Sequence, residues 1–444
     1  MEKITKRITV FLIALCMAVL CGCQEDNYDD AQENKDVLVI YALEDNYQMW
    51  ELNDLINKYQ EQYDDAQVVL QIGMENSSDD RAAKIQRLNN SIISGKGPDI
   101  LLLEGLPQEK YVEQGMLEDM EEFVHKQVVE QDLFPTIVET YKVDEAQYGI
   151  PYCFTMMNVS ALEHYEGFES LDTLEGFRDY LKQLQEKDDI PVYGKWSYDQ
   201  IISIVYRLYV AEQEGFLEKI SEENIEKFYQ VIHEIYQMVD MKEVEEAGKT
   251  MDTVSLLPLG YETLDLVATG NIQFSLDYIE TPDNLRNLIA LQQNGYATSL
   301  LKNENNLLCV PAITFGVVKK DKEKQELIES FLSFALSENV QQEIDTLPVN
   351  RNAMKKVLNN FNNEQITIET EEPVSVMTLD FTKLAEDEIE KWIDIFEKTT
   401  CVGMTDQKIF GIIMENARYV VAGKMSEADA AHEAYRQISV YQDE

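Results

Sequence analysis

The chain has 444 residues, of which 83 are acidic and 37 are basic, and its formal net charge is −46. Such a negative field repels nucleic acid and anionic lipid surfaces, so the charge excludes nucleic acid as a partner. The length exceeds what one hydrophobic core usually organises, and we therefore expect about two domains after the N-terminal segment.

The N-terminus is typical of a secretion signal. Three basic residues precede an apolar run from Ile8 to Leu20, and small residues precede Cys23. The run is shorter than the roughly 20 residues of a membrane-spanning helix. The spacing resembles a bacterial lipobox, whose cysteine receives diacylglycerol, so we expect lipidation at Cys23. An uncleaved anchor helix is the alternative. Residues 24–36 are polar and acidic, and they predict a flexible tether.

The remaining cysteines predict no disulfide framework. Outside the predicted signal and its lipid site the chain has only Cys153, Cys309 and Cys401. They are odd in number and far apart in the sequence, and no Cys-x-x-Cys pair provides a zinc or redox site. We expect them to be buried as small apolar side chains.

Strands and helices alternate in the first part of the folded chain. Short apolar runs predict strands at 37–41, 68–72 and 99–103. Between them, apolar side chains at helical spacing predict helices over 49–63 and 85–92. This order predicts an α/β fold with a parallel sheet and helices on both faces. Ligands bind beyond the carboxyl ends of the strands in such sheets.

The second half of the chain is predicted to be richer in helix. Helix dominates from Leu171 to Ala247, and strands are expected at 270–276 and 313–318. A further helix covers 323–336. The last helix begins at Ser426-Glu427-Ala428-Asp429, a capping-box pattern in which side chains satisfy free backbone amides.

Six segments carry a family resemblance through their order and their coverage of the chain. They are Gly95-Lys96-Gly97-Pro98-Asp99-Ile100, Gln114 to Met120, Tyr148-Gly149-Ile150-Pro151-Tyr152, Thr269 to Phe274, Phe331 to Asn350, and Gly423 to Tyr441. This set resembles the extracellular solute-binding proteins of ABC importers, in the carbohydrate-type, maltose-binding-protein-like family 1. The resemblance implies a two-lobed periplasmic-binding-protein-like (type II) fold. Each lobe has a central β-sheet flanked by helices, and hinge strands join the lobes and let them close on a ligand.

The expected organisation follows from the signal and the resemblance. It comprises a lipoprotein signal peptide at 1–22, a lipidated cysteine and acidic tether at 23–36, a first lobe of 37–152 plus 278–319, and a second lobe of 153–277 plus 320–444.

Polar residues just past the predicted strands are candidate ligand contacts. Glu44, Asn46 and Tyr47 follow the first strand, and Glu104 follows the third. Their position suits hydrogen bonds to sugar hydroxyls. The alternative is that they are solvated loop residues.

The resemblance places further candidates on the strands that cross between the lobes. Tyr152 and Phe154 lie on one crossing, and Asp277 and Tyr278 lie on the other.

Two more aromatic side chains are candidate platforms for the apolar face of a sugar ring. Trp196 lies in a turn-rich segment, and the alternative for it is ordinary packing against a helix. The family ending often places a ligand-facing aromatic at the position of Phe410, for which the alternative is a helix core.

Catalytic motifs are missing from the sequence. None of the four histidines has a partner at metal-ligand spacing, and no Gly-x-Ser-x-Gly elbow or Walker loop occurs. We therefore expect no enzyme activity, no cofactor and no metal site.

The expected function is that of a monomeric, lipid-anchored binding subunit on the extracellular face of a bacterial cell membrane. It would capture a small solute, an oligosaccharide by expectation, and deliver it to the permease subunits of an ABC transporter. Two alternatives stay open: a lipid-anchored extracellular glycan-active enzyme, and a ligand sensor for a membrane kinase.

Overall fold

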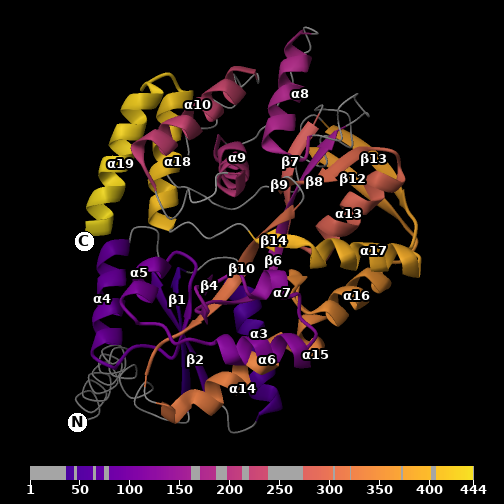
Figure 1. Cartoon of the computed structure of the whole chain (residues 1–444). Coiled ribbons are helices and arrows are strands. Elements are labelled where there is room, and N and C mark those ends of the chain that lie inside the picture. The colour runs from indigo at the N-terminus through magenta and orange to yellow at the C-terminus, as the bar shows by residue number, and fades with distance from the viewer. Residues whose placement is uncertain are drawn as a thin grey trace, which may run out of the picture. The chain divides into compact units, whose positions relative to one another are not determined.

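The computed structural model describes residues 37–44, 48–63, 67–74, 80–161, 171–186, 198–212, 220–238, 274–303, 306–320, 322–371, 374–401 and 407–443. The predicted signal, Cys23 and the tether lie outside these ranges. The chain divides into two compact units (Figure 1). Unit 1 comprises Met1–Leu106, Lys110–Asp119 and Phe315–Phe334, and unit 2 comprises Pro107–Glu109, Met120–Thr314 and Ala335–Glu444. These units and the predicted lobes assign four ranges differently, namely 107–109, 120–152, 278–314 and 320–334, and the lobe boundaries stay a prediction.

Unit 1 contains the predicted parallel sheet. Strand β1 (Val37–Glu44) pairs in parallel with β2 (Gln67–Met74) on one side and with β3 (Ile100–Leu102) on the other. The last residues of β10 (Asn306–Val317) pair antiparallel with β3. Residues 37–43 are all buried, as expected for an apolar run in a central parallel strand. The three predicted strands and their parallel pairing are confirmed.

Helices cover the sheet of unit 1, and the apolar periodicity predicted three of them, those at 48–62, 81–93 and 325–336. The full set is α3 (Gln48–Gln62), α4 (Arg81–Ile93), α5 (Gln108–Glu113), η2 (Lys322–Lys324) and α14 (Gln325–Leu336). Tyr59 of α3 is fully buried, and its ring packs against Phe331 of α14 at 5.2 Å. Its hydroxyl donates to Ser330 Oγ at 3.1 Å, so burial of the ring leaves no unpaired polar group.

A buried carboxylate ties the segments of unit 1 together. Asp99 is fully buried and accepts hydrogen bonds from the backbone N–H of Val39 at 2.8 Å, Lys320 Nζ at 2.9 Å and Lys324 Nζ at 3.0 Å. We call these four residues the Asp99 cluster. Burial lowers the pKa of Lys320, and the Asp99 carboxylate opposes that shift. The Pro-Asp-Ile entry to β3 therefore has a structural role.

Unit 2 is organised around the long strand β6 (Ile150–Ala161). Its second half lies between β7 (Phe274–Ile279) and β8 (Ala297–Leu300), both antiparallel to it. Its first half pairs with β11 (Leu347–Pro348). The first residues of β10 pair antiparallel with β9 (Lys302–Asn303) and parallel with β14 (Thr399–Cys401). The strand predicted at 313–318 therefore starts earlier, at Asn306, and residues 270–273 of the other prediction lie outside the described ranges.

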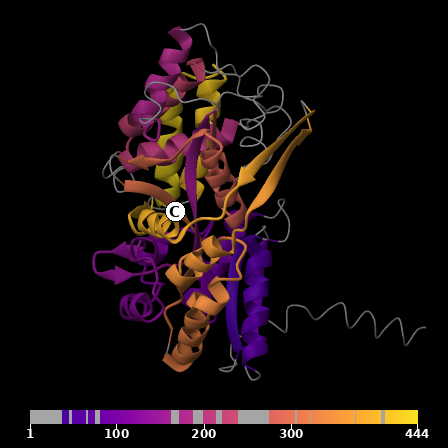
Figure 2. The same ribbon diagram turned by 90° about the vertical axis from the view of Figure 1, so that its right-hand side faces the viewer.

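The remaining elements of unit 2 are mostly helices. They are α6 (Glu121–Glu130), α7 (Pro135–Val138), the pair β4 (Lys142–Val143) and β5 (Ala146–Gln147), α8 (Leu174–Glu186), α9 (Tyr198–Glu212), α10 (Glu222–Met238), α13 (Pro282–Gln293), α15 (Glu338–Gln341), α16 (Arg351–Asn360), the hairpin β12 (Glu364–Glu371) and β13 (Val374–Phe381), α17 (Glu386–Glu397), α18 (Gln407–Val421) and α19 (Glu427–Asp443). Figure 2 shows the hairpin as a long two-stranded ribbon.

Helices α10, α18 and α19 pack side by side over one apolar core (Figure 1). Tyr229 of α10 is fully buried in it, and its hydroxyl donates to the carbonyl of Ile413 at 3.0 Å. Helix α19 begins as predicted, because Ser426 Oγ accepts the backbone N–H of Asp429 at 3.1 Å. No helix in the described ranges is both long and apolar enough to cross a membrane.

A second motif of the family resemblance has a clear structural role in unit 2. Gln341 is fully buried, donates to the carbonyl of Tyr152 at 3.0 Å and accepts the backbone N–H of Val349 at 2.9 Å. Asn350, also fully buried, caps α16 by accepting the backbone N–H of Ala353 at 3.0 Å. The Leu-Pro-Val-Asn segment is thus fixed by buried side-chain hydrogen bonds.

Candidate functional site

Two of the predicted residues in unit 1 lie at the carboxyl ends of its strands. Glu44 is the last residue of β1, and Glu104 follows β3 by two positions. Both are partly exposed. Arg81, the first residue of α4, forms an ion pair with Glu44 and donates to the carbonyl of Gly105 at 2.7 Å. The ends of β1 and β3 are therefore joined by one guanidinium, at the edge where α/β sheets bind ligands.

The sequence prediction missed Arg81. Its side chain is 33% exposed and that of Glu44 is 44% exposed, so solvent reaches the ion pair. The sequence does contain a signal for the position of Arg81. This residue starts the helix that follows the second strand, and such a helix begins at the carboxyl edge of the sheet, where Glu44 also lies. The guanidinium offers planar hydrogen-bond donors that suit oxygen atoms of a ligand.

In unit 2, Asp277 and Tyr278 are neighbours on β7 and therefore point to opposite faces of the sheet. Asp277 is buried, opposite the buried Asn158 of β6. Tyr278 is half-buried, and its hydroxyl lies 3.0 Å from Ser203 Oγ and accepts from Arg207 Nε at 3.2 Å. Helix α9 supplies both of these partners.

Arg207 also connects Tyr278 to the predicted residue Phe410. Its guanidinium carbon lies 5.9 Å from the centre of the Phe410 ring, a cation–π arrangement. Phe410 is 5% exposed, and its ring packs against Tyr206 at 5.2 Å. We call Ser203, Arg207, Tyr278 and Phe410 the Tyr278 cluster. Phe410 belongs to the buried apolar core of unit 2, as the helix-core alternative predicted. The half-buried Tyr278 ring, its hydroxyl and the Arg207 guanidinium are therefore the groups of this cluster that suit a polar, uncharged ligand.

Tyr152 and Phe154 are core residues in this structure. Their exposures are 1% and 0%, and the Phe154 ring packs against Phe396 at 5.9 Å. Neither ring presents a surface to a solute here, and their role in binding stays a prediction. The sequence could not separate a buried crossing strand from a ligand-facing one, because both are rich in aromatic residues.

Asn46, Tyr47 and Trp196 lie outside the described residues, so their predicted roles are carried forward as predictions.

Glu280, which the sequence prediction did not single out, follows β7 two positions after Tyr278. Burial raises the pKa of its carboxyl from 4.5 to about 7. Its backbone N–H donates to Asn284 Oδ1 at 3.2 Å, at the start of α13. Nothing in the sequence distinguishes this carboxylate from the other acidic residues, since its burial depends on the fold.

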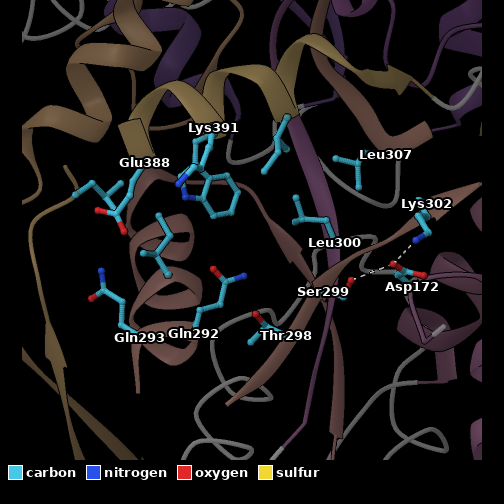
Figure 3. Close-up of a pocket in the computed structure, with 14 residues that line it drawn as sticks. Asp172, Gln292, Gln293, Thr298, Ser299, Leu300, Lys302, Leu307, Glu388 and Lys391 are labelled. Carbon is cyan, nitrogen blue, oxygen red and sulfur yellow. Dashed lines mark hydrogen bonds and ion pairs between the residues drawn. The ribbon is translucent and has the colours of Figure 1, made fainter. Parts of the chain in front are cut away.

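A separate groove lies within unit 2, between β8, α13 and α17 (Figure 3). Its volume is about 580 Å³. Trp392, Gln292 and Thr298 line it, a combination of aromatic, amide and hydroxyl groups that resembles a sugar site. None of the residues predicted to bind the ligand lines this groove.

Several polar side chains of the groove, although not the Thr298 hydroxyl, are bonded within the fold. Gln293 exchanges two hydrogen bonds of 2.8 Å with the backbone of Thr382. Asp172 pairs with Lys302 at 2.7 Å, as Figure 3 shows. Glu388 accepts a backbone N–H at the start of α17 at 2.7 Å. A ligand would have to compete with these bonds, so we regard the groove as a structural feature.

The part of the chain that the structure describes contains no group of three or more histidine, cysteine or acidic side chains placed to hold a metal ion.

Solved structures with the same fold are solute-binding proteins. A Streptococcus pneumoniae solute-binding protein in complex with the blood group A-trisaccharide aligns with a TM-score of 0.55 and 14% identity, over 90% of this chain and 99% of that one. An ABC substrate-binding protein from Listeria monocytogenes in complex with cycloalternan aligns with a TM-score of 0.51 and 16% identity, over 92% and 100%. Maltose-bound MalE3 of T. maritima aligns with a TM-score of 0.53 and 12% identity, over 91% and 100%.

These likenesses confirm the predicted α/β, periplasmic-binding-protein-like fold class. No curated protein sequence matches the chain. The family model of the bacterial extracellular solute-binding proteins matches residues 54–367, which is more than half of the chain and includes residues of both units. The predicted family is thus confirmed: the chain belongs to the bacterial extracellular solute-binding proteins.

Proposed function

We propose that this protein captures a carbohydrate, an oligosaccharide in the first instance, and delivers it to the permease of an ABC importer. The family match over residues 54–367 carries the proposal. Solved structures of the same fold hold a trisaccharide, cycloalternan and maltose, which supports a sugar as the ligand class. The Listeria protein is itself an ABC substrate-binding protein, which supports the transporter as partner.

The proposed sugar contacts are the polar groups that the fold leaves partly exposed. In unit 1 they are Glu44, Arg81 and Glu104, whose oxygens and guanidinium suit sugar hydroxyls. In unit 2 they are Tyr278 and Arg207, an aromatic ring and a guanidinium beside each other. As the family resemblance implies, the sugar would occupy the cleft between the two predicted lobes.

A variant pair tests the contacts in unit 2. Arg207→Gln removes the charge and one donor to Tyr278, and we expect sugar affinity to fall about tenfold, because bonds to charged groups contribute about 1.5–3 kcal/mol. Arg436→Gln is the matched control, since Arg436 lies on the exposed face of α19 beside Glu433. Calorimetric titration with oligosaccharides measures both. If both variants bind the sugar with equal affinity, the Tyr278 cluster is not part of the binding site.

The second part of the proposal is a lipid anchor at Cys23 that holds the protein on the extracellular face of the cell membrane. A membrane-held binding protein keeps its captured solute near the permease, which raises the effective concentration of the complex there. We expect Cys23→Ala to abolish incorporation of labelled fatty acid and to release the protein from the membrane fraction. Labelling that persists in Cys23→Ala would contradict the anchor.

A further inference from the structure

Two of the three cysteines in the described chain face each other across a pair of strands. Cys309 lies on β10 and Cys401 on β14, and the parallel register of these strands pairs the two residues directly. Register partners send their side chains to the same face of a sheet. Both residues belong to unit 2, so fold contacts within one unit bring them together.

The separation of paired strands suits a covalent bond between the thiols. Neighbouring strands lie about 4.8 Å apart, and disulfides join α-carbons that are about 4.4–6.8 Å apart. The Cys401 thiol also lies within hydrogen-bonding reach of the Cys309 thiol. The register and spacing of the two strands therefore suit a disulfide between Cys309 and Cys401.

The surroundings of the two thiols differ. Cys309 is fully buried, and its burial, together with the neighbouring Cys401, raises the pKa of its thiol. Cys401 is half-buried, so a reagent in solution reaches it first. The third thiol, Cys153, is fully buried on β6 and donates to the carbonyl of Ala312 at 3.3 Å.

We propose that Cys309 and Cys401 form a reversible disulfide that covalently links β14 to β10. The compartment favours it, because extracellular proteins meet oxidising conditions. The oxidant is a small-molecule disulfide, such as oxidised glutathione. This inference goes beyond the proposed sugar capture and does not depend on it. Besides the strand geometry, it requires only the family's extracellular location.

The reaction is a pair of thiol–disulfide exchanges. The Cys401 thiolate attacks one sulfur of the oxidant, forms a mixed disulfide and releases the first small thiol. The Cys309 thiolate then attacks the Cys401 sulfur and releases the second small thiol. The protein loses two protons and two electrons in total, and the oxidant is reduced to two thiols.

The test is mass spectrometry of the purified protein after incubation with oxidised glutathione. The protein is denatured, its free thiols are alkylated, and it is digested without reduction. We expect a peptide that links Cys309 to Cys401, with Cys153 alkylated. Full alkylation of Cys309 and Cys401, or any linkage that includes Cys153, would overturn the proposal.

Single variants separate the two roles. We expect Cys309→Ser to retain a stable glutathione adduct on Cys401, because the second thiol is missing, and Cys401→Ser to form neither adduct nor link. Cys153→Ser is the matched control and should link as the unaltered chain does. The link should raise the melting temperature by about 5 °C in the unaltered chain and in Cys153→Ser, but not in Cys401→Ser. A glutathione adduct on Cys309 in Cys401→Ser would contradict the order of attack.

Discussion

The Asp99 cluster of unit 1 and the Tyr278 cluster of unit 2 both bring positive charge to an oxygen atom, but they differ in exposure. Asp99 is fully buried and accepts from one backbone amide and two lysines. Tyr278 is half-buried, as are its partners Ser203 and Arg207. A buried charge whose hydrogen bonds are all made within the protein stabilises the fold and is inaccessible to a ligand. A half-buried polar cluster can also form hydrogen bonds to a solute. Exposure therefore separates the structural polar groups from the candidate binding groups.

The largest expected effect is at the Asp99 cluster. Asp99→Ala leaves Lys320 and Lys324 without their buried counter-ion, and such a loss costs about 3–5 kcal/mol of unfolding free energy. Urea denaturation measures it. Asp387→Ala is the control, because this carboxylate is 75% exposed in its pair with Lys391 and should contribute less than about 1 kcal/mol. A loss below 1 kcal/mol for Asp99→Ala would contradict the structural role.

Glu280 gives the next largest effect, and it depends on pH. The folded-state pKa of about 7 lies above the ordinary 4.5, so the folded protein holds this proton more tightly than the unfolded chain does. The associated stability is complete below pH 4.5 and is lost as the pH rises through 7. The glutamine of Glu280→Gln cannot ionise, so this variant does not lose stability in this way as the pH rises. Relative to the unaltered chain, we expect its unfolding free energy to increase by about 3 kcal/mol between pH 4.5 and pH 8.

Denaturation of both proteins at the two pH values tests this prediction. A stability difference between them that does not change with pH would show that the Glu280 carboxyl titrates normally.

A substitution in the Tyr278 cluster should weaken sugar binding more than it lowers stability, unlike the substitution of Asp99. Tyr278→Phe keeps the ring but removes the hydroxyl that Ser203 and Arg207 contact. We expect sugar affinity to fall about tenfold while the unfolding free energy changes by about 1 kcal/mol or less. Titration calorimetry and urea denaturation of the same preparation measure the two effects. A large loss of stability with unchanged affinity would place Tyr278 with Asp99 among the structural groups.

The smallest effect is expected in the groove of Figure 3. Gln293→Ala removes two exposed hydrogen bonds to Thr382, and we expect a loss of about 1 kcal/mol in stability with no change in sugar affinity. A tenfold loss of affinity in this variant would instead move the binding site to the groove.

The sequence was sufficient for the sheet of unit 1 because local patterns determine it. The apolar runs at 37–41 and 99–103 are buried in the structure, whereas the run at 68–72 lies in the edge strand β2 and is partly buried. The helices between these strands follow the spacing of their apolar side chains. The start of α19 was equally predictable, since a cap is a local hydrogen bond from Ser426.

The candidate site was less predictable because its contacts join distant parts of the chain. Arg81 meets Glu44, and Arg207 meets Tyr278, across long stretches of sequence. The start of the second helix places Arg81 at the edge of the sheet that holds Glu44, but no local pattern specifies either pairing. The same holds for Cys309 and Cys401, which become neighbours only through the register of the three-residue strand β14.

The motifs that indicated the family also turned out to have structural roles. Asp99 and Asn350 are fully buried and bonded to backbone groups, so their sequence signals report how the fold is held together. A family motif thus identified the fold correctly without identifying ligand contacts. This is why fold and family were predictable while the binding residues need experiment.

Calorimetric titration of the purified protein with neutral oligosaccharides, beginning with maltose-type and cyclic sugars, tests the central claim most directly. We predict saturable binding of one sugar per chain, with the sugar recovered chemically unchanged. Absence of binding across a panel of sugars, peptides and polyamines, or recovery of a cleaved sugar, would contradict the account.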